Sequence, residues 1–427
     1  MALTLRDFLR DLGDQLIRID DEIDPVTQAA ALCSAAPRPI LLERLRGFPG
    51  WKLTDILVKD RVRQALALGV SSPKHVVREL SDRMFSRVPG QTKLISDGPC
   101  KEVKLIGDAA VVADALVWAN LRGMDSHGVA RVPGYVEWMR RGDINVKPRM
   151  VVATETPAVV VLDADRAAGP IAMTSAMQHA VGKARDAGAG LVLVRATTHT
   201  AALGYYTLIA AREGMAGLAF AASTPLMAYH GARAPGVSTT PISIALPGGD
   251  GDPLLLDMSS SLIAMGKLNQ ARRTGEPLPE GAALDAEGRP TTDATQAVTP
   301  LPMGGPKGSG LALMVECLTS LVLGNPIAAE VLEGTARGER HRQNCLALAI
   351  DVARFGDPQA FQREAQRLIR ALKALPRAAG VDEILMPGER GRRTLERRTR
   401  EGIPLPPSVV AELSKVAAAL GVTMFAA

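Results

Sequence analysis

The chain has 427 residues, with 50 Lys and Arg against 45 Asp and Glu, so its formal net charge is +5. Apolar residues make up 47% and charged residues 22%, a balance that excludes a disordered or low-complexity chain. The charge is too small for this length to require a nucleic-acid partner, and no apolar run approaches the roughly 18 residues of a membrane span. At roughly 150 residues per domain, the length allows two or three domains.

Cysteine usage and the first residues bear on the compartment. The four cysteines are far apart and form no CxxC pair, so they indicate reduced thiols and a cytoplasmic protein: Cys33, Cys100, Cys317 and Cys345. Charge appears by Arg6 and Asp7 with no apolar segment before it, so no signal peptide is expected.

The first 109 residues are predicted to form a small α/β extension. Apolar spacing and turn residues predict a helix over 5–16, strands within 15–23 and 38–58, and a helix over 72–87. Residues 88–101 are rich in loop-forming residues and are the predicted linker. The sequence therefore predicts a domain boundary near residue 109, followed by a second domain over 110–427.

Beyond residue 110, predicted helices and strands alternate. Helices are expected over 111–122, 126–141, 173–187, 205–214, 308–324, 358–375 and 407–421. Strands are expected over 150–162, 190–195, 215–222 and 345–351, with two more within 236–260 on either side of a turn at 247–253. Ser126 is the expected N-cap of the helix over 126–141. The alternation predicts an α/β or α+β class with mixed sheets.

The segment Asp125–Tyr135 carries the first candidate site. If it is helical, His127, Arg131 and Tyr135 are spaced by four residues and share one face, although Pro133 argues against a continuous helix. A histidine can exchange a proton near neutral pH, and an arginine fork suits a carboxylate. A capped helix with a surface ion pair is the structural alternative.

The second candidate is His199, which follows the predicted buried strand over 190–195. A polar loop at the carboxyl end of a buried strand is a common place for a ligand in α/β proteins. A loop histidine with a purely structural hydrogen bond is the alternative.

Two further segments are candidates for binding an anionic ligand. Asp257, Met258, Ser259, Ser260 and Ser261 follow a strand, with Lys267 close behind, and such groups can bind ribose or phosphate or can cap a helix. Gly304, Gly305, Lys307 and Gly308 precede a predicted helix, where a phosphate could bind.

Other motifs narrow the function further. The chain contains no GxGxxG and no Walker A spacing, which argues against an ordinary Rossmann domain and a P-loop NTPase. The remaining histidines are scattered, so no metal site is expected. Residues 388–400 hold six arginines, which could bind an anion but are more typical of an exposed strand–turn–helix surface with interleaved Glu.

In order, the segments 120–135, 190–206, 256–267, 284–293 and 303–316 resemble the type-2 malate/L-lactate dehydrogenase family, and the resemblance covers about 110–425. It implies a non-Rossmann fold that binds NAD or NADP, a homodimer, and interconversion of a 2-oxo acid and a 2-hydroxy acid. It further implies that His199 is the general acid/base, or His127 paired with Ser126. Arg131 would hold the substrate carboxylate and Tyr135 would orient it. The dinucleotide would be bound by Asp257, Met258, Ser259, Ser260, Lys267, Gly305, Lys307 and Gly308.

The chain departs from that family's pattern at three places. The loop after His199 contains Ala201 and Ala202 where the family usually has an aromatic residue and a glycine. The family's Gly-Thr-Asn-Pro is replaced by Ser-Thr-Thr-Pro over 238–241, and Pro306 replaces the usual Tyr.

Residues 1–109 resemble the N-terminal region of UbiD-type decarboxylases through the segments 5–12, 15–25, 39–47 and 97–108. In UbiD-type decarboxylases the prenylated-flavin and metal site lies further along the chain than this resemblance extends. Decarboxylation by this chain is therefore not expected. Two hypotheses therefore remain. The first is a nicotinamide-dependent 2-hydroxy-acid oxidoreductase; the second is a non-catalytic protein that docks a UbiD-type decarboxylase through residues 1–109.

Overall fold

The computed structural model of the chain describes residues 17–23, 40–45, 53–55, 108–248, 252–336 and 342–422. The chain divides into two compact units, Met1–Glu102 and Val103–Ala427, and each is described by itself. The helices predicted over 5–16 and 72–87, and the linker predicted over 88–101, lie outside the described residues. The domain boundary predicted at residue 109 stays a prediction.

The first unit contains a three-stranded sheet. Its strands are β1 (Ile17–Ile23), β2 (Ile40–Leu45) and β3 (Leu53–Asp55), in the order β1-β2-β3. β1 and β2 run parallel, and β2 and β3 run antiparallel. These strands fall inside the two segments where the sequence predicts strands.

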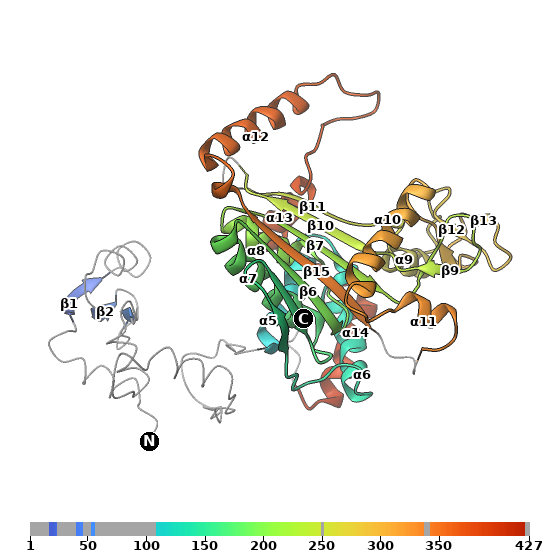
Figure 1. Ribbon diagram of the computed structural model, residues 1–427, viewed down its shortest axis with the longest axis horizontal. Helices are drawn as coiled ribbons and strands as arrows, with labels where there is room; N and C mark the ends of the chain where they lie inside the picture. The colour runs from blue at the N-terminus through green and yellow to red at the C-terminus, as the bar shows by residue number, and fades with distance from the viewer. Residues whose placement is uncertain are drawn as a thin grey trace. The chain divides into compact units, whose positions relative to one another are not determined.

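The second unit is built on a seven-stranded mixed sheet with the strand order β11-β10-β7-β15-β6-β5-β4 (Figure 1). Only β5 and β6 pair in parallel; the other neighbours are antiparallel. The fold class is therefore confirmed as mixed α/β. The strands are β4 (Val151–Glu155), β5 (Val159–Asp163), β6 (Ala189–Thr197), β7 (Met215–Ser223), β10 (Pro241–Leu246), β11 (Leu254–Ser259) and β15 (Gln343–Asp351).

Helices cover the two faces of this sheet unequally. Cys345, Ala347 and Ala349 alternate along β15 and are buried in one core with α7 (Gly169–Ala187), which packs beside α8 (Gly204–Arg212). Asn344 precedes Cys345 and therefore points to the opposite face of the sheet. There it contacts the short π-helix over Cys317–Leu321, which continues α10 (Pro306–Glu316). The core is filled mainly by Ala, Val and Met, because the chain has only 3 Trp, 4 Tyr and 7 Phe.

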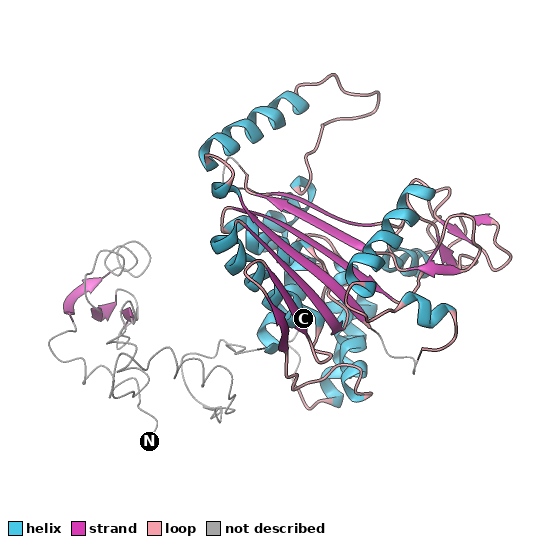
Figure 2. Cartoon of the chain, viewed as in Figure 1, coloured by secondary structure: helices cyan, strands magenta, loops and turns pink. Residues whose placement is uncertain are grey.

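Beside the sheet lies a smaller layer with its own core. It contains α9 (Met265–Thr274) and the short strands β12 (Ala283–Leu284), β13 (Pro290–Thr291) and β14 (Thr299–Pro300) (Figure 2). Its buried residues are Ile263, Leu268, Ala271, Leu278, Ala282, Ala283, Ala294 and Ala297.

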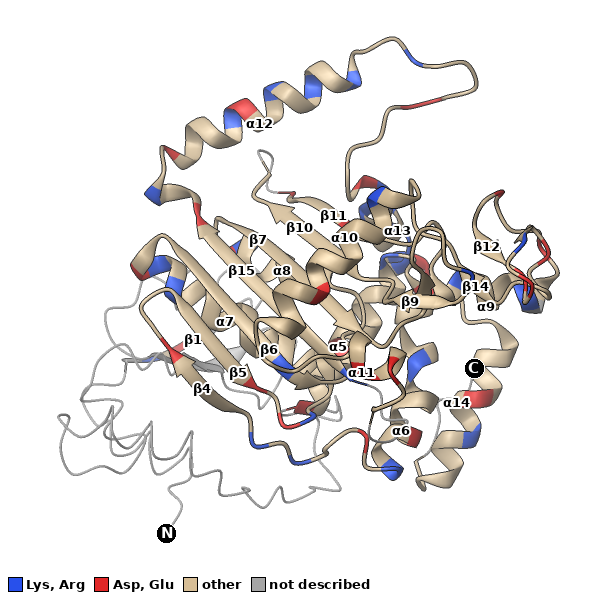
Figure 3. Cartoon of the chain, turned by 45° about the vertical axis from the view of Figure 1, so that its right-hand side comes forward, with Lys and Arg blue, Asp and Glu red and all other residues tan. Residues whose placement is uncertain are grey.

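The remaining elements flank these layers: α5 (Asp108–Leu121), α6 (Val132–Arg140), β8 (Met227–Ala228), β9 (Pro235–Val237), α11 (Ala328–Leu332), α12 (Pro358–Lys373), α13 (Glu389–Glu401) and α14 (Pro407–Ala419). The strands of the large sheet carry few charges, whereas α12 and α13 carry many (Figure 3). Among the described residues, no helix combines the length and the apolar character that a membrane crossing requires.

Two predicted elements are wrong, and a third, the β-like run over 150–162, is divided by a turn. Residues 126–141 form two 3-10 turns, Asp125–His127 and Val129–Arg131, followed by α6, so Ser126 caps no α-helix. Pro133 lies in the first turn of α6, where its missing N–H costs nothing, and the helix therefore begins only at Val132. The run 150–162 is two antiparallel strands, β4 and β5. The basic segment 388–400 contains no strand and forms α13.

Two glycines give a paired test of this packing. A Cβ on Gly217 of β7 would lie 2.6 Å from the Thr207 carbonyl of α8, whereas a Cβ on Gly182 of α7 would have no neighbour within 4 Å. We expect Gly217→Ala to lower the free energy of unfolding by about 1–3 kcal/mol, because the helix must move away. We expect Gly182→Ala to raise the free energy of unfolding by about 0.5–1 kcal/mol, because alanine lowers the conformational entropy of the unfolded chain. Denaturant titration measures both, and equal effects of the two substitutions would contradict the packing.

Candidate active site

His199 lies in a loop whose backbone is fixed on both sides. The hydroxyls of Thr197 and Thr198 each donate to the Ala167 carbonyl at 3.2 Å, just before the histidine. The phenol of the fully buried Tyr206 donates to the Thr200 carbonyl at 2.5 Å, just after it. The loop follows β6, at the carboxyl end of a buried strand, as the sequence predicts.

Tyr135 lies against the imidazole of His199. Its Oη is 2.8 Å from Nδ1 and 3.2 Å from the His199 carbonyl oxygen. The Ala201 N–H also points at Nδ1, at 3.3 Å. Burial raises the pKa of Tyr135 far above its usual value, so the side chain remains a neutral phenol. The structure thus brings together Tyr135 and His199, which are 64 residues apart in sequence.

His127 and Ser126 complete a polar cluster with His199. The two imidazole rings stack with centroids 5.6 Å apart, and Ser126 Oγ is 2.9 Å from His127 Nδ1. Burial, and then the positive charge of Arg131, lower the pKa of His127 to about 4. His127 is therefore neutral at pH 7, and it offers a hydrogen bond rather than a charge.

Arg131 keeps its two terminal nitrogens available for an anion. Its Nε donates to the Ser126 carbonyl at 2.6 Å, and among the described residues no acceptor is paired with Nη1 or Nη2. Burial lowers the pKa of the guanidinium from its usual value, which shows that the charge is incompletely solvated. A carboxylate bound by the two-pronged fork would compensate it.

The start of α9, which carries Lys267, adjoins this cluster, and the other two predicted cofactor segments contact each other. A Cβ on Gly266 would lie 2.1 Å from Ser126 Cβ, so the first turn of α9 packs directly on the Ser126 turn. Lys267 is the next residue and is exposed. The Met303 N–H donates to the Ser260 carbonyl at 2.9 Å, which joins the turn before α10 to the end of β11. The structure therefore places the 257–261 and 303–308 segments side by side.

The residues at the start of α10 fit the phosphate of a dinucleotide. Gly304 and Gly305 have positive φ, and a Cβ on Gly308 would lie 2.5 Å from the Met303 carbonyl oxygen, so this turn needs glycines. Lys307 is exposed beside the positive end of an 11-residue helix. A mobile ammonium at that end suits a phosphate, which would be held there by the charge of Lys307.

Asp257 and Ser260 already have partners within the fold. The Asp257 carboxylate accepts the Gly204 N–H at 2.8 Å at the start of α8, and burial raises its pKa to about 6. Ser260 Oγ donates to the Thr239 carbonyl at 3.0 Å. Ser259 is half-buried with its hydroxyl on Ser261, and Met258 pairs with Ile242 in the sheet. Contact of these residues with a cofactor stays a prediction.

Two of the departures from the family pattern coincide with left-handed backbone. Ala201 has φ +53° and Thr240 has φ +32°, in the region that glycine and asparagine tolerate best. Thr240 is held there by its hydroxyl, which is 2.7 Å from Ser238 Oγ. Two of the unusual residues, Ala201 and Thr240, thus carry backbone strain.

Three residues of this region escape prediction from the sequence. Trp138 stacks on Tyr135 with ring centroids 5.8 Å apart and lies 6.4 Å from His199. Its spacing of three from Tyr135 on a helix was the available signal. Asn120 and Arg398 hold the 125–131 segment, and no local pattern marks them. In the part of the chain that is described, no cluster of His, Cys, Asp and Glu is placed to hold a metal ion.

Comparison with known proteins identifies the family. The model of malate/L-lactate dehydrogenase matches residues 106–414. The chain belongs to this family. A second model, the 3-octaprenyl-4-hydroxybenzoate carboxy-lyase N-terminal domain, matches residues 8–84, which confirms the resemblance of the N-terminal region.

Individual relatives agree with this assignment. The malate dehydrogenase of Pyrococcus horikoshii is 36% identical over 360 residues, covering 82% of this chain and 97% of the relative. The solved sulfolactate dehydrogenase of Methanocaldococcus jannaschii has a TM-score of 0.68 at 35% identity, covering 74% of this chain and 91% of that chain. Relatives named for NAD(+) and for NADP(+) both occur: ureidoglycolate dehydrogenase of Escherichia coli K12 and (2R)-3-sulfolactate dehydrogenase of Chromohalobacter salexigens. They are 31% and 36% identical and cover 70% and 72% of this chain, and 85% and 90% of their own lengths.

The lowered pKa of His127 has a consequence for stability. Between pH 6.5 and about 4 the unfolded chain binds a proton at this histidine and the folded chain does not, so the free energy of unfolding falls as the pH falls through that window. Relative to His127→Gln, the wild type should lose up to about 3 kcal/mol between pH 7 and pH 4. Urea titrations across this range measure the difference.

Asp257 acts in the opposite direction, because its raised pKa makes the folded chain the better proton acceptor between about pH 6 and 3.8. It is present in both proteins, so the comparison cancels its contribution. Parallel stability curves for wild type and His127→Gln would show that His127 is not buried as described.

Proposed function

We propose that this chain uses NAD or NADP to interconvert a small 2-oxo acid and the corresponding 2-hydroxy acid, with residues 110–427 carrying the activity. The observation that carries the proposal is the Tyr135–His199–His127–Arg131 cluster, in which a proton-exchanging group lies near an unpaired carboxylate-binding fork. Membership of the malate/L-lactate dehydrogenase family supports it. The non-catalytic docking alternative finds no support among the relatives, which are named as dehydrogenases.

Arg131 and His127 bind the substrate in this proposal. The two Nη groups of Arg131 pair with the substrate carboxylate, which compensates the positive charge that burial leaves incompletely solvated. His127 stays neutral and donates a hydrogen bond, with its ring held by Ser126. The alternative in which His127 is the acid is disfavoured, because a pKa near 4 leaves it without an acidic proton at neutral pH.

His199 transfers the proton in this proposal, and the nicotinamide, when bound, supplies or accepts the hydride at the substrate carbon. When His199 is protonated, its Nδ1–H donates to Tyr135 Oη and the contact with the Ala201 N–H is given up, while the phenol donates to the His199 carbonyl. Nε2 then gives its proton to the substrate oxygen, and the ring is left neutral with the same Nδ1 hydrogen bond. In the oxidation direction Nε2 accepts the proton. Tyr135 therefore orients the ring in both states.

Lys267 and Lys307 bind the cofactor phosphates in this proposal. It is supported by the packing of the first turn of α9 on the Ser126 turn and by the hydrogen bond that joins the turn before α10 to Ser260. Cys317 and Cys345 are free thiols, which supports a cytoplasmic location.

We propose that the enzyme is a homodimer. The α10 helix and its π-helical continuation expose a row of large apolar side chains, with exposed fractions between 37% and 65%: Leu313, Met314, Leu318, Leu321 and Val322. An apolar row of this size on a folded protein is typical of an interface between subunits.

Turnover tests the proposed reaction. Purified protein should oxidise NADH or NADPH in the presence of at least one member of a panel of 2-oxo acids that includes oxaloacetate, pyruvate and sulfopyruvate. His199→Ala should abolish turnover while the dissociation constant of the nicotinamide stays within about twofold, because the substitution removes only the proton-transfer group. Loss of reduced-nicotinamide absorbance measures rate. Absence of both turnover and nicotinamide binding in the wild type would refute the proposal.

The subunit interface has its own test. Leu318→Glu combined with Leu321→Glu places two charges in the apolar row and should convert the dimer to a monomer, as measured by light scattering coupled to size exclusion. Leu368→Glu on the exposed face of α12 is the matched control and should leave the mass unchanged. A wild type that is monomeric at micromolar concentration would contradict the dimer.

A further inference from the structure

The guanidinium of Arg398 forms a two-pronged salt bridge across 273 residues of sequence. From α13, its Nη1 donates to Asp125 Oδ1 at 2.6 Å and its Nη2 donates to Asp125 Oδ2 at 3.0 Å. Nη1 also donates to the carbonyl of Asn120 in the last turn of α5. The Arg398 side chain is only 11% exposed, although the Asp125 side chain is 46% exposed, so the arginine is the buried partner of this pair.

Asn120 anchors the same segment from inside. Its Nδ2 donates to Asp125 Oδ1 at 2.7 Å, and its Oδ1 accepts the Val129 N–H at 2.7 Å. The backbone wraps so closely around this side chain that a Cβ on Gly128 would lie 2.1 Å from Asn120 Oδ1. Asp125 and Val129 are therefore fixed, and Ser126 and His127 lie between them.

The fixed segment has little internal support of its own. It consists of two three-residue 3-10 turns, closed by single hydrogen bonds such as His127 N–H to the Met124 carbonyl at 2.9 Å and Gly128 N–H to the Asp125 carbonyl at 3.3 Å. Such turns have poorer hydrogen-bond geometry than an α-helix. A shift of the turn would move the His127 ring from its stack on His199. It would also move the Ser126 carbonyl that holds Arg131 Nε.

We propose that Arg398 is a positioning residue for the reaction: with Asn120, it clamps Asp125 and thereby fixes the turn that presents His127 and Arg131 to the substrate. The inference rests on the proposed function of that turn. The hydrogen bonds of Arg398 go to Asp125 and to the Asn120 carbonyl, so it acts on those side chains indirectly. The basic segment 388–400 is predicted to be an exposed surface. One of its arginines, Arg398, instead binds a carboxylate within the fold.

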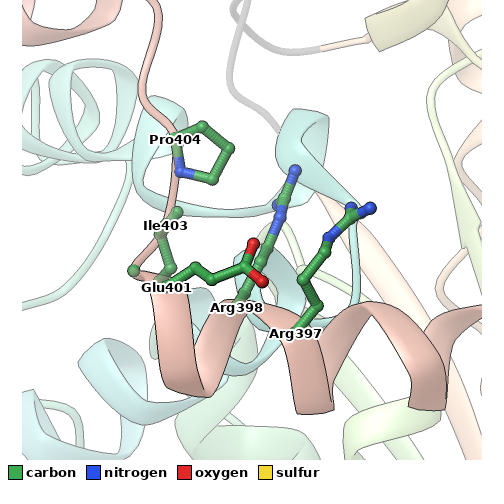
Figure 4. A pocket seen from close by; sticks show the side chains of 6 residues that line it. Arg397, Arg398, Glu401, Ile403 and Pro404 are labelled. Carbon is green, nitrogen blue, oxygen red and sulfur yellow. The ribbon is translucent and has the colours of Figure 1, made fainter.

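The neighbouring residue supplies a matched control. Arg397 and Arg398 rise side by side from α13 and line a cavity of about 420 Å³ with Glu401, Ile403 and Pro404 (Figure 4). Arg397 is exposed, and Arg398 Nε is buried with no hydrogen-bond partner among the described residues. Arg398 therefore acts through its two Nη groups, which a free guanidinium ion can replace if it enters through this cavity.

The kinetic test compares Arg398→Ala with Arg397→Ala. Arg398→Ala should lower kcat/KM for the oxo acid by about 10²-fold, since small displacements of reacting groups have effects of that size, while the KM for the nicotinamide stays within about twofold. Low concentrations of guanidinium, well below those that unfold proteins, should restore at least a tenth of the lost activity. Arg398→Lys should recover less than half of it, because an ammonium lacks the fork. Arg397→Ala should match the wild type with and without guanidinium.

A second measurement is independent of turnover. Imidazole signals in ¹⁵N-detected NMR report the ring environment of His127, assigned by its loss in His127→Gln. The His127 signal should shift in Arg398→Met and in Asp125→Asn. The variant with both substitutions should show the same shift as either one alone, because both remove the same ion pair. The signal should stay in place in Arg397→Met. If the wild type shows no turnover but these shifts occur, the proposed function fails and the clamp stands.

Three outcomes would overturn the clamp: an unshifted His127 signal in both Arg398→Met and Asp125→Asn, wild-type kcat/KM in Arg398→Ala, or equal losses in Arg397→Ala. If Arg398→Met does not fold, Asp125→Asn supplies the same NMR comparison, because it removes the ion pair but keeps the acceptor for Asn120.

Discussion

The insertion of β15 between β6 and β7 is the constraint on which the rest of the second unit depends. This strand comes late in the chain, yet it pairs antiparallel with both neighbours over most of its length. Asn344 lies near its start and is fully buried, and its side chain uses every hydrogen-bonding position. Its Oδ1 accepts the Ala196 N–H at 3.1 Å and the Asn325 Nδ2–H at 2.8 Å, and its Nδ2 donates to Ser320 Oγ and to the Asn325 carbonyl. Ala196 has φ +55°, and His199 follows three residues later.

The same buried network reaches the helix that is proposed to bind the cofactor phosphates. Ser320 Oγ donates to Glu316 at 2.9 Å, and the other oxygen of Glu316 accepts the backbone N–H groups of Ile327 and Ala328. A buried carboxylate is stable only when it is bonded in this way, because an unpaired one would be strongly destabilising. The end of β6, the middle of the sheet and the C-terminal part of α10 are therefore one bonded unit. The loop of His199 is built on the rigid part of the fold.

The turn that is proposed to bind the substrate has a different kind of support. Residues 125–131 belong to no sheet and depend on side chains from α5 and α13, which are far apart in sequence. The active-site cluster forms where this turn meets the β6 loop, and the stacking of His127 on His199 marks the meeting point. The loop that carries the proposed proton-transfer group and the turn that carries the proposed carboxylate-binding group are therefore held by different contacts.

Local sequence patterns predicted most helices and strands, because the apolar spacing that marks such an element lies within the element itself. The buried strands β6, β7 and β15 appear as short apolar runs, and α7, α8 and α14 as helical spacing. The helix predicted over 126–141 failed for a physical reason that the sequence only hinted at. Pro133 starts α6 late, and Asn120 accepts the Val129 N–H that Ser126 would bond as an N-cap. The run over 150–162 concealed a turn, because Pro157 lies between two strands that both satisfy the strand pattern.

The sequence by itself determined the residue types of the site, the family and the alternation of strands and helices, because these are carried by short segments whose chemistry is local. It marked His199, His127, Ser126, Arg131 and Tyr135 as candidates but gave no reason for His199 to meet the other four. The tertiary structure decided that Tyr135 contacts His199, that Asp257 and Ser260 have bonds within the fold, and that Arg398 contacts Asp125. These contacts join residues tens to hundreds of positions apart. They form only because burying the apolar face of the sheet brings its helices and strand ends together, and no local pattern in the chain encodes that distance.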